Sequence, residues 1–448
     1  MATREFTSWG GQSAFVSHVV SPASAASAAL PATPFLAVGA GRSYGDTGLP
    51  VAVAVDTSSM RRILSFDARA GVLRAESGIL LAEIIDAIVP HGWFLPVTPG
   101  TRHVTLGGAV ANDVHGKNHH RGGTFGCHVR AFELLRSNGV RLVCSPSKNA
   151  DYFVATIGGM GLTGLVTWVE IELMKTGSPH VAQTATRFAN LREYFAVHAE
   201  SDADFEYSVA WIDSLASGAH LGRGVSMLGN HARPEDLPPP APGDAMRAAR
   251  IGVPFRLPFA AVSGPALRAF NAAYFRKPLG RAGATVDYKS FFYPLDGVNG
   301  WNRLYGPRGL RQFQCVVPEA NAEAAIGDML RLAQHAGQGS FLTVLKKFGV
   351  TLSPGLLSFP RPGFTLTLDF PYRGPVTDRL LGDLDAIALA AGGGVNPYKD
   401  ARMSREVFEA SFPRWRQMQA AIDPLAQSQF SQRIGLTGVA HPAIYAAA

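Results

Sequence analysis

Three glycine-rich segments in the first part of the chain constrain its fold more than any other feature. They are VGAGRSYGD at 38–46, TPGTRHVTLGGAVANDVHGKNHH at 98–120 and GGMGLTG at 158–164. Glycine lets the backbone adopt left-handed angles and approach a ligand closely. Successive free N–H groups in such loops form a concave site for an anion such as a pyrophosphate. The segments therefore predict loops that hold a phosphate-bearing ligand.

None of the three segments is specific by itself. The first is not the Rossmann fingerprint, because no Gly-x-Gly-x-x-Gly opens a helix there. Taken alone, it is better explained as an ordinary glycine turn. The small residues of the third would let a flat ring or a ribityl chain lie against the backbone. Three such loops on one β-rich domain form a more specific constellation than any one of them.

The second segment also holds a cluster of histidines. His115, His119 and His120 follow Asp113 closely. The spacing lacks the His-Glu-x-x-His pattern and no thiolate is nearby, so we expect no metal site. A hydrogen bond from His115 to substrate or cofactor is the better interpretation, and His119 and His120 are compatible with surface or core histidines.

Composition narrows the class of protein. The 448 residues are 47% hydrophobic and only 17% charged, which predicts a globular chain of two to four domains. No apolar run is long enough for a membrane-spanning helix. The three cysteines are too few for a disulfide framework. The first residues lack the pattern of a secretory signal, so a cytoplasmic location is expected.

The charge balance indicates an anionic partner. Lys and Arg number 41 against 34 Asp and Glu, which gives a net charge of +7. Excess positive charge favours nucleic acid, a phosphorylated substrate or an acidic membrane surface. The sequence contains no nucleic-acid motif, so a phosphate-bearing substrate or an anionic lipid is expected. A basic surface without a specific partner remains the alternative.

The first region has the pattern of short strands with one helix. Apolar side chains recur at helical spacing at Leu80, Leu81, Ile84, Ile85 and Ile88, and Pro90 with Gly92 ends that helix. Asn138-Gly139 signals a hairpin turn. Apolar runs between turn residues predict strands at 51–55, 62–66, 72–75, 94–97, 129–135, 140–144 and 165–173. The glycine-rich character stops near Gly177, where we place the first domain boundary.

The second region follows a different order of elements. Helices are expected at 319–336 and 378–391, with strands at 205–212, 312–317, 341–345 and 364–370. This order predicts an α+β domain whose antiparallel sheet carries helices on one face. The fold class is therefore α+β with two domains.

The segment 230–281 stands apart. It contains nine prolines and eight Arg or Lys against three Asp or Glu, a local charge of +5. Prolines remove backbone donors and fix backbone angles, so we expect little regular structure there. A mobile linker is one interpretation. The other is a basic and apolar loop beside the substrate pocket that contacts a membrane or a lipid phosphate.

Several strings together resemble one known family. GRSYGD at 41–46, HGKNHH at 115–120 and YKD at 398–400 are similar to the decaprenylphosphoryl-β-D-ribose 2′-oxidase family, within the vanillyl-alcohol oxidase / p-cresol methylhydroxylase flavoproteins. YSVAWID at 207–213 and WNRLY at 301–305 extend the similarity over nearly the whole chain. HGKNHH is the distinctive string, whereas Gly-Arg-Ser is shared with other sugar and lactone oxidases.

The resemblance implies a two-domain flavoprotein. Residues 1–177 and 395–448 would form the FAD-binding domain, and residues 178–394 the substrate domain. The residues expected to bind FAD are Gly39, Ala40, Gly41, Arg42, Ser43, Tyr44, Gly45, Asp46, Gly100, Thr101, Thr105, Gly107, Gly108, Asn112, His115, Gly161, Gly164, Val166, Asn396 and Lys399. Relatives with covalent flavin often attach it to a histidine where this chain has Tyr44, so we expect non-covalent FAD.

The resemblance also implies a substrate pocket on the open face of the flavin. The residues expected to bind substrate are Lys117, Trp211, Gln312, Gln314, Lys346 and Thr367. Lys399, if desolvated, would either accept the proton of the hydroxyl or hold its oxygen, although it could also only pin a flavin carbonyl. Tyr44 and His115 could relay the proton, and Lys117 and Lys346 could pair with a phosphate.

Two positions depart from the family. A cysteine of the mycobacterial enzymes corresponds to Thr367 here, and a tyrosine three residues before the conserved lysine corresponds to Asn396. We expect oxidation to survive the change at Thr367, because the cysteine is not chemically required.

The expected reaction is oxidation of the C2 hydroxyl of a polyprenylphosphoryl ribose, the first half of an epimerisation that supplies arabinose for cell-envelope glycans. A quinone or O₂ would reoxidise the flavin, and a short-chain reductase partner would reduce the ketone. The enzyme would be cytoplasmic, with possible peripheral contact at the inner membrane face. The alternatives are an alditol or aldonolactone oxidase and a non-catalytic flavin-binding protein.

Overall fold

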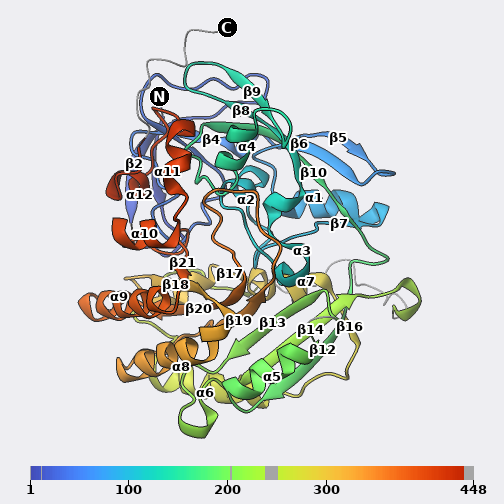
Figure 1. The fold of residues 1–448 in the computed structure, drawn as a ribbon, viewed down its shortest axis with the longest axis vertical. Helices are drawn as coiled ribbons and strands as arrows, with labels where there is room; N and C mark the ends of the chain where they lie inside the picture. The colour runs from blue at the N-terminus through green and yellow to red at the C-terminus, as the bar shows by residue number, and fades with distance from the viewer. Residues whose placement is uncertain (1, 12, 202–203, 238–250, 438–448) are drawn as a thin grey trace.

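The computed structural model describes residues 2–11, 13–201, 204–237 and 251–437. Two lobes lie one above the other (Figure 1). The first part of the chain and the C-terminal segment share one lobe, and the middle of the chain forms the other. The α+β class expected from the sequence is confirmed, since each lobe combines sheets and helices.

The first lobe contains two small sheets. The four-stranded sheet has the order β1 (Ala2–Thr7), β2 (Ala14–Val20), β4 (Val53–Asp56) and β3 (Phe35–Val38). The five-stranded sheet is antiparallel, with the order β5 (Ile63–Asp67), β6 (Val72–Glu76), β10 (Leu165–Glu172), β8 (Val129–Leu135) and β9 (Arg141–Cys144). The predicted hairpin joins β8 and β9, where Gly139 has φ of 83°.

Short helices pack on these sheets. The predicted helix is α1 (Leu81–Ile88), and Gly92 follows it in the left-handed conformation. The other helices of this lobe are α2 (Leu106–Ala111), α3 (His119–Gly122), α4 (Ala150–Thr156), α10 (Arg405–Ser411), α11 (Trp415–Met418) and α12 (Gln429–Arg433). The strand expected at 94–97 is shorter and earlier: β7 covers Trp93–Phe94 and pairs with β11 (Met174–Lys175).

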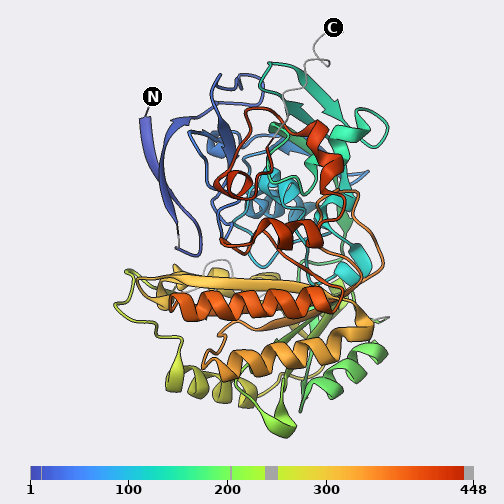
Figure 2. The same ribbon diagram turned by 60° about the vertical axis from the view of Figure 1, so that its left-hand side comes forward.

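The second lobe is built on one eight-stranded antiparallel sheet. Its order is β16 (Ala284–Val286), β12 (Val181–Phe188), β14 (Gly224–His231), β13 (Tyr207–Ile212), β19 (Val344–Phe348), β20 (Gly363–Pro371), β18 (Leu310–Val317) and β21 (Gly394–Val395). Three helices cover the face turned away from the first lobe (Figure 2): α5 (Leu191–Ser201), α8 (Glu319–His335) and α9 (Pro375–Ala390).

Strand alternation divides the side chains of this sheet between two environments. Leu366 and Leu368 on β20 and Phe313 on β18 pack into the core beneath the helices. The residues between them point to the opposite face, which is turned toward the first lobe. Thr367 and Gln314 are among these residues, so the sheet presents polar groups to the space between the lobes.

The structure corrects two expectations for the second region. The strand expected at 341–345 lies three residues later, at β19. The segment 230–281 was expected to lack regular structure, which is wrong for its last part: α6 spans Gly264–Arg276. Pro265 lies in the first turn of α6, where a missing N–H costs no hydrogen bond. Residues 238–250 of the segment lie outside the described residues.

The remaining elements of the middle region are short. They are α7 (Tyr288–Phe292) and the two-stranded pair β15 (Ile251–Gly252) with β17 (Val298–Asn299). No helix in the described ranges is long and apolar enough to span a membrane.

After β21 the chain returns to the first lobe. The N–H of Phe35 donates to Leu425 O at 2.8 Å, and the N–H of Gln427 donates to Phe35 O at 2.8 Å. Arg433 pairs with both carboxylate oxygens of Asp46, at 2.9 and 3.0 Å. These contacts support the expected domain division, which we propose for this chain. Residues 1–177 and 395–448 would form one domain, and residues 178–394 the other.

A close contact holds the returning chain against the first glycine-rich loop. The N–H of Tyr44 donates to Tyr398 O at 3.0 Å. A Cβ on Gly45 would lie 1.8 Å from the carbonyl oxygen of Asp400, so only glycine fits at this position. Residues 44–45 consequently pack directly against residues 398–400.

The substitution Gly45→Ala tests this contact. We expect the free energy of unfolding to fall by about 1–3 kcal/mol, because the added methyl group forces the two segments apart. Gly48→Ala is the matched control, since a Cβ there comes no closer than 3.4 Å to Ser43. Urea unfolding of both holoenzymes measures the difference, and equal stability of the two variants would contradict the account.

Candidate active site

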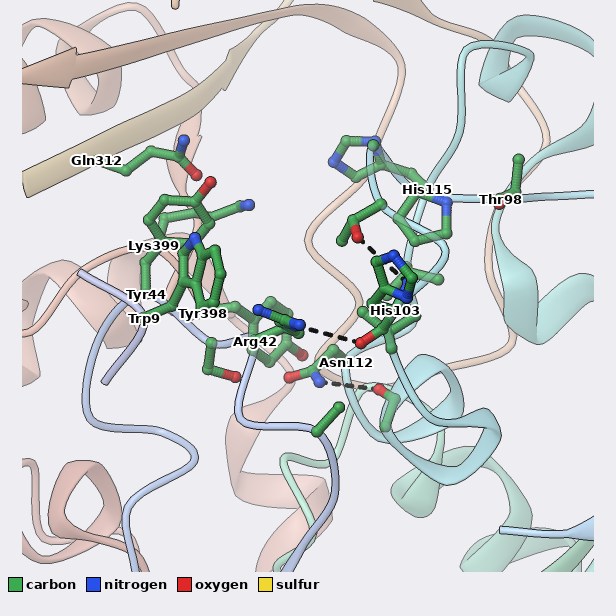
Figure 3. A pocket seen from close by; sticks show the side chains of 18 of the residues that line it. Trp9, Arg42, Tyr44, Thr98, His103, Asn112, His115, Gln312, Tyr398 and Lys399 are labelled. Atoms are coloured by element: carbon green, nitrogen blue, oxygen red, sulfur yellow. Dashed lines mark hydrogen bonds between the residues drawn. The ribbon is translucent and has the colours of Figure 1, made fainter. Parts of the chain in front are cut away.

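A cavity of about 660 Å³ lies between the lobes. Residues of all three glycine-rich segments line it, together with residues on the face of the large sheet. The close-up in Figure 3 shows Lys399, Tyr44, Trp9 and Gln312 on one side of this space, with His115 and His103 opposite. Of the site residues expected from the sequence, all but Gly45 and Asp46 line the cavity.

The two exceptions have other contacts. Gly45 packs against Asp400, as described above, and Asp46 forms its ion pair with Arg433 on α12. Both therefore support the shape of the first loop from behind.

The first and second loops form a cradle of bare backbone. Gly41 has φ of 62°, and a Cβ on Gly41 or on Gly100 would meet no atom within 4 Å. A Cβ on Gly39 would lie 2.3 Å from the Thr105 hydroxyl oxygen, so the two loops are in contact. Arg42 Nε donates to the carbonyl oxygen of His103 at 3.3 Å across the same gap (Figure 3). This cradle fits a pyrophosphate.

The third loop is bonded directly to the second. The N–H of Gly158 donates to Val110 O at 2.9 Å, and the N–H of Met160 donates to Ala111 O at 2.8 Å. Met160 and Gly161 have positive φ values, 57° and 74°. Gly161, together with Gly164 and Val166, therefore brings uncovered backbone to the cavity wall. The open Cβ positions and the cavity volume fit a flavin dinucleotide.

Lys399 lies buried beside Tyr44. Its Nζ is 4.4 Å from the centre of the Tyr44 ring. Burial lowers the pKa of Lys399, and the charge of Asp369 opposes this shift. Burial also raises the pKa of Tyr44, so its phenol stays protonated at neutral pH, where the O–H can donate and its oxygen can accept from Gln312 and Trp9.

Asp369 is a site residue that sequence reasoning missed. It is fully buried on β20, two residues from Thr367, and Gln312 Nε2 donates to its Oδ1 at 2.5 Å. Burial raises the pKa of the Asp369 carboxyl group. A polar residue in a strand otherwise rich in apolar residues was the available signal.

His115 lies on the opposite wall with both ring nitrogens engaged. Nε2 is 3.1 Å from Gln314 Nε2, and Nδ1 is 3.0 Å from Lys346 Nζ. Burial and the charge of Lys346 lower the pKa of His115 well below its usual value, so the ring is neutral. His115 and Lys346, expected in different roles, are thus in direct contact.

Lys117 is the third buried lysine of the cavity. Its Nζ donates to the carbonyl oxygen of Phe291, and it lies 4.5 Å from the centre of the Phe291 ring. Burial lowers the pKa of Lys117 to about 7.

One end of the cavity is lined by aromatic side chains. The ring of Trp211 lies 4.6 Å from that of Tyr274, and Phe270 lies 4.7 Å from Phe341. Tyr274 and Phe270 belong to α6, which was not expected from the sequence. Their i, i+4 spacing places both on one face of α6. Trp9 is a further lining residue that sequence reasoning missed, and Arg42 lies 4.1 Å from the centre of its ring.

Comparison with known proteins assigns the first lobe to a cofactor family. Residues 17–145 match the family described as FAD binding domain. These residues include the first two glycine-rich loops. The chain therefore contains an FAD-binding domain, and the cradle described above lies within the matched residues.

The whole chain is similar to named proteins. It is 34% identical over 401 residues to decaprenylphosphoryl-β-D-ribose oxidase of Mycolicibacterium smegmatis, covering 87% of this chain and 86% of that protein. It is 34% identical over 375 residues to the uncharacterized protein in the mprA 5′ region of Streptomyces coelicolor, covering 80% and 100%. Similarity to L-gulonolactone oxidase of Bos taurus, 31% over 137 residues, covers 30% of each chain. The chain thus belongs to the decaprenylphosphoryl-β-D-ribose oxidase family of FAD-dependent oxidoreductases.

Proposed function

We propose that this protein oxidises the C2 hydroxyl of a polyprenylphosphoryl-β-D-ribose to the 2-keto sugar. The observation that carries the proposal is the set of side chains that line the cavity. Three buried lysines, Lys117, Lys346 and Lys399, line it beside the glycine cradle. Amino groups next to a flavin site suit a phosphate-bearing substrate, and the family to which the chain belongs indicates a ribose linked to a polyprenyl lipid.

The bound FAD would supply the acceptor for the hydride that leaves the carbinol carbon. The residues of this chain then have to orient the sugar and move the hydroxyl proton. Lys399 stands on the cofactor side of the cavity next to Tyr44. Because Asp369 favours its charged form, Lys399 is suited to hold the reacting oxygen as an ammonium donor.

The two ends of the substrate would bind to different parts of the cavity. Lys117 would pair with the phosphate, and Gln312 and Trp211 would contact the sugar. The aromatic side chains at the end formed by α6 would cover the first isoprenoid units. Their burial would contribute binding energy in proportion to the apolar area removed from water.

The other partners follow from the same reaction. A quinone or O₂ would reoxidise the flavin, and a short-chain reductase would complete the epimerisation. The exposed Phe255 and Phe259, 64% and 65% accessible, would bring the enzyme to the inner membrane face. Co-sedimentation with anionic vesicles would test this contact, and recovery of all the protein in the supernatant would contradict it.

Anaerobic reduction of the flavin by a panel of alcohols tests the proposed substrate. We expect a polyprenylphosphoryl ribose to bleach the flavin band, whereas free ribitol and aldonolactones leave it unchanged at equal concentration. Preferential bleaching by a lactone or polyol would support the alternative oxidase. No bleaching by any compound would support a non-catalytic flavin protein.

We predict that the FAD can be released. Tyr44 stands where covalent relatives often carry the attaching histidine, and a phenol is not a usual attachment point. Acid or heat precipitation should leave yellow flavin in the supernatant. A flavin band that stays with the precipitate would show a covalent bond.

Lys399→Met tests the role assigned to Lys399. The variant keeps the length of the side chain, so we expect it to retain FAD but to reduce the flavin at least about a hundred-fold more slowly, in line with the loss of a donor positioned at the reacting oxygen. Stopped-flow absorbance measures the rate. Lys175→Met, at an exposed lysine on β11, is the matched control. Near-normal reduction by Lys399→Met would contradict the assignment.

A further inference from the structure

A chain of hydrogen bonds runs from the backbone of the returning segment to Lys346. The N–H of Tyr398 donates to Asn396 Oδ1 at 3.0 Å, and Asn396 Nδ2 donates to Gln314 Oε1 at 2.8 Å. Gln314 Nε2 lies 3.1 Å from His115 Nε2. His115 Nδ1 in turn lies 3.0 Å from Lys346 Nζ. Four side chains from different parts of the fold are therefore connected in series.

The direction of this chain is fixed at its first link. A backbone N–H can only donate, so the oxygen of Asn396 must face Tyr398. The amide nitrogen of Asn396 then faces Gln314 and requires its oxygen. Gln314 consequently points its own nitrogen at His115, and the same nitrogen donates to the Thr365 hydroxyl at 3.0 Å. Turning either amide over would place two donors face to face.

The same logic sets the tautomer of His115. Its Nε2 faces an amide donor and must accept, so the proton of the neutral ring lies on Nδ1. Turning the ring over would put carbon atoms against both partners. The ring also packs edge-on to Phe348, at 4.8 Å between ring centres, which holds its orientation. The Nδ1–H of His115 therefore points at Lys346 Nζ, 3.0 Å away, with the carbonyl oxygen of Gly116 as a second acceptor.

A donor pointing at Lys346 requires a lone pair on its nitrogen. An ammonium group has none, so the 3.0 Å contact between Nδ1 and Nζ is a hydrogen bond only when Lys346 is a neutral amine. The charges around Lys346 also favour its neutral form. Burial, Lys117 and Lys399 lower the pKa of Lys346 to about 7, and the described residues provide it with no ion pair. The titratable groups that face or influence Lys346 are His115, Lys117, His119 and Lys399.

We propose that Lys346 is a second catalytic residue, the proton acceptor of the oxidation, and that Asn396, Gln314 and His115 are positioning residues that keep it a neutral amine. This inference rests on the proposed function. The proton of the substrate hydroxyl passes to Lys346 Nζ, while the carbinol hydride and its electron pair leave to FAD, and the alcohol becomes a ketone. The resulting ammonium no longer accepts from His115 and keeps its existing hydrogen bond to the carbonyl oxygen of Gly116, at 3.3 Å.

A variant that reverses the direction of these hydrogen bonds at Asn396 tests the proposal. In Asn396→Asp the carboxylate accepts from both neighbours, so Gln314 turns its nitrogen toward residue 396 and its oxygen toward His115. His115 then carries its proton on Nε2, and Nδ1 accepts from Lys346 as an ammonium. We expect the ¹⁵N NMR signals of [¹⁵N]histidine-labelled resting holoenzyme to show Nδ1–H in the wild type and Nε2–H in Asn396→Asp.

Two further variants separate the effect of reversed hydrogen-bond direction from the effect of an added negative charge. Gln314→Glu reverses the chain one link later and should give the same Nε2–H signals. Thr365→Asp adds a carboxylate next to Gln314 but leaves the amide donating to His115, so it should keep Nδ1–H. The His115 signal is assigned by its loss in His115→Gln. An Nε2–H tautomer in the wild type, or no change in both reversing variants, would overturn the proposal.

The kinetic consequence is a loss of rate without a loss of binding. We expect the limiting rate of flavin reduction to fall at least ten-fold in Asn396→Asp, with an unchanged or lower dissociation constant for the phosphorylated substrate. Acidification of the wild type through about 7 should slow reduction similarly, because acid protonates Lys346. Weaker binding at an unchanged limiting rate would instead make Lys346 a phosphate ligand only. The NMR experiment measures the His115 tautomer without substrate. Its outcome therefore tests this inference even if the proposed substrate is wrong.

Discussion

The contact between residues 44–45 and 398–400 is the constraint on which the site depends. The Tyr44–Tyr398 hydrogen bond and the missing Cβ of Gly45 let the returning chain lie directly on the first glycine-rich loop. Lys399 is thereby carried to the FAD side of the cavity. Asn396, three residues earlier, still contacts β18 of the other lobe through Gln314. One short segment thus sets both the cofactor side and the substrate side of the site.

The buried charges of the cavity explain how similar lysines can act differently. Lys399 is near Asp369, whose charge favours an ammonium, whereas Lys346 faces the donor side of His115, which favours a neutral amine. A holder of the reacting oxygen and an acceptor of its proton can therefore coexist in one low-dielectric space. The difference arises from hydrogen-bond direction and one carboxylate, since burial affects both lysines alike.

Local sequence patterns predicted part of the fold and much of the candidate site. Glycine spacing indicated the cradle, Asn138-Gly139 indicated the β8–β9 hairpin, and the YKD string indicated Lys399. The contacts of Asp369 and of the His115–Lys346 pair were not predictable, because they join strands and loops far apart in sequence. The helix α6 was missed because its surroundings are rich in proline, although the one proline at its start is compatible with a helix.

The central claim is that this cavity oxidises C2 of a phosphorylated ribose held between the FAD cradle and the sheet. The most direct test is the rate of anaerobic flavin bleaching with substrate deuterated at a single ring position. The account predicts that deuterium at C2 slows bleaching several-fold, while deuterium at C1 or C3 has little effect. A large effect at C1 or C3 with none at C2 would contradict it.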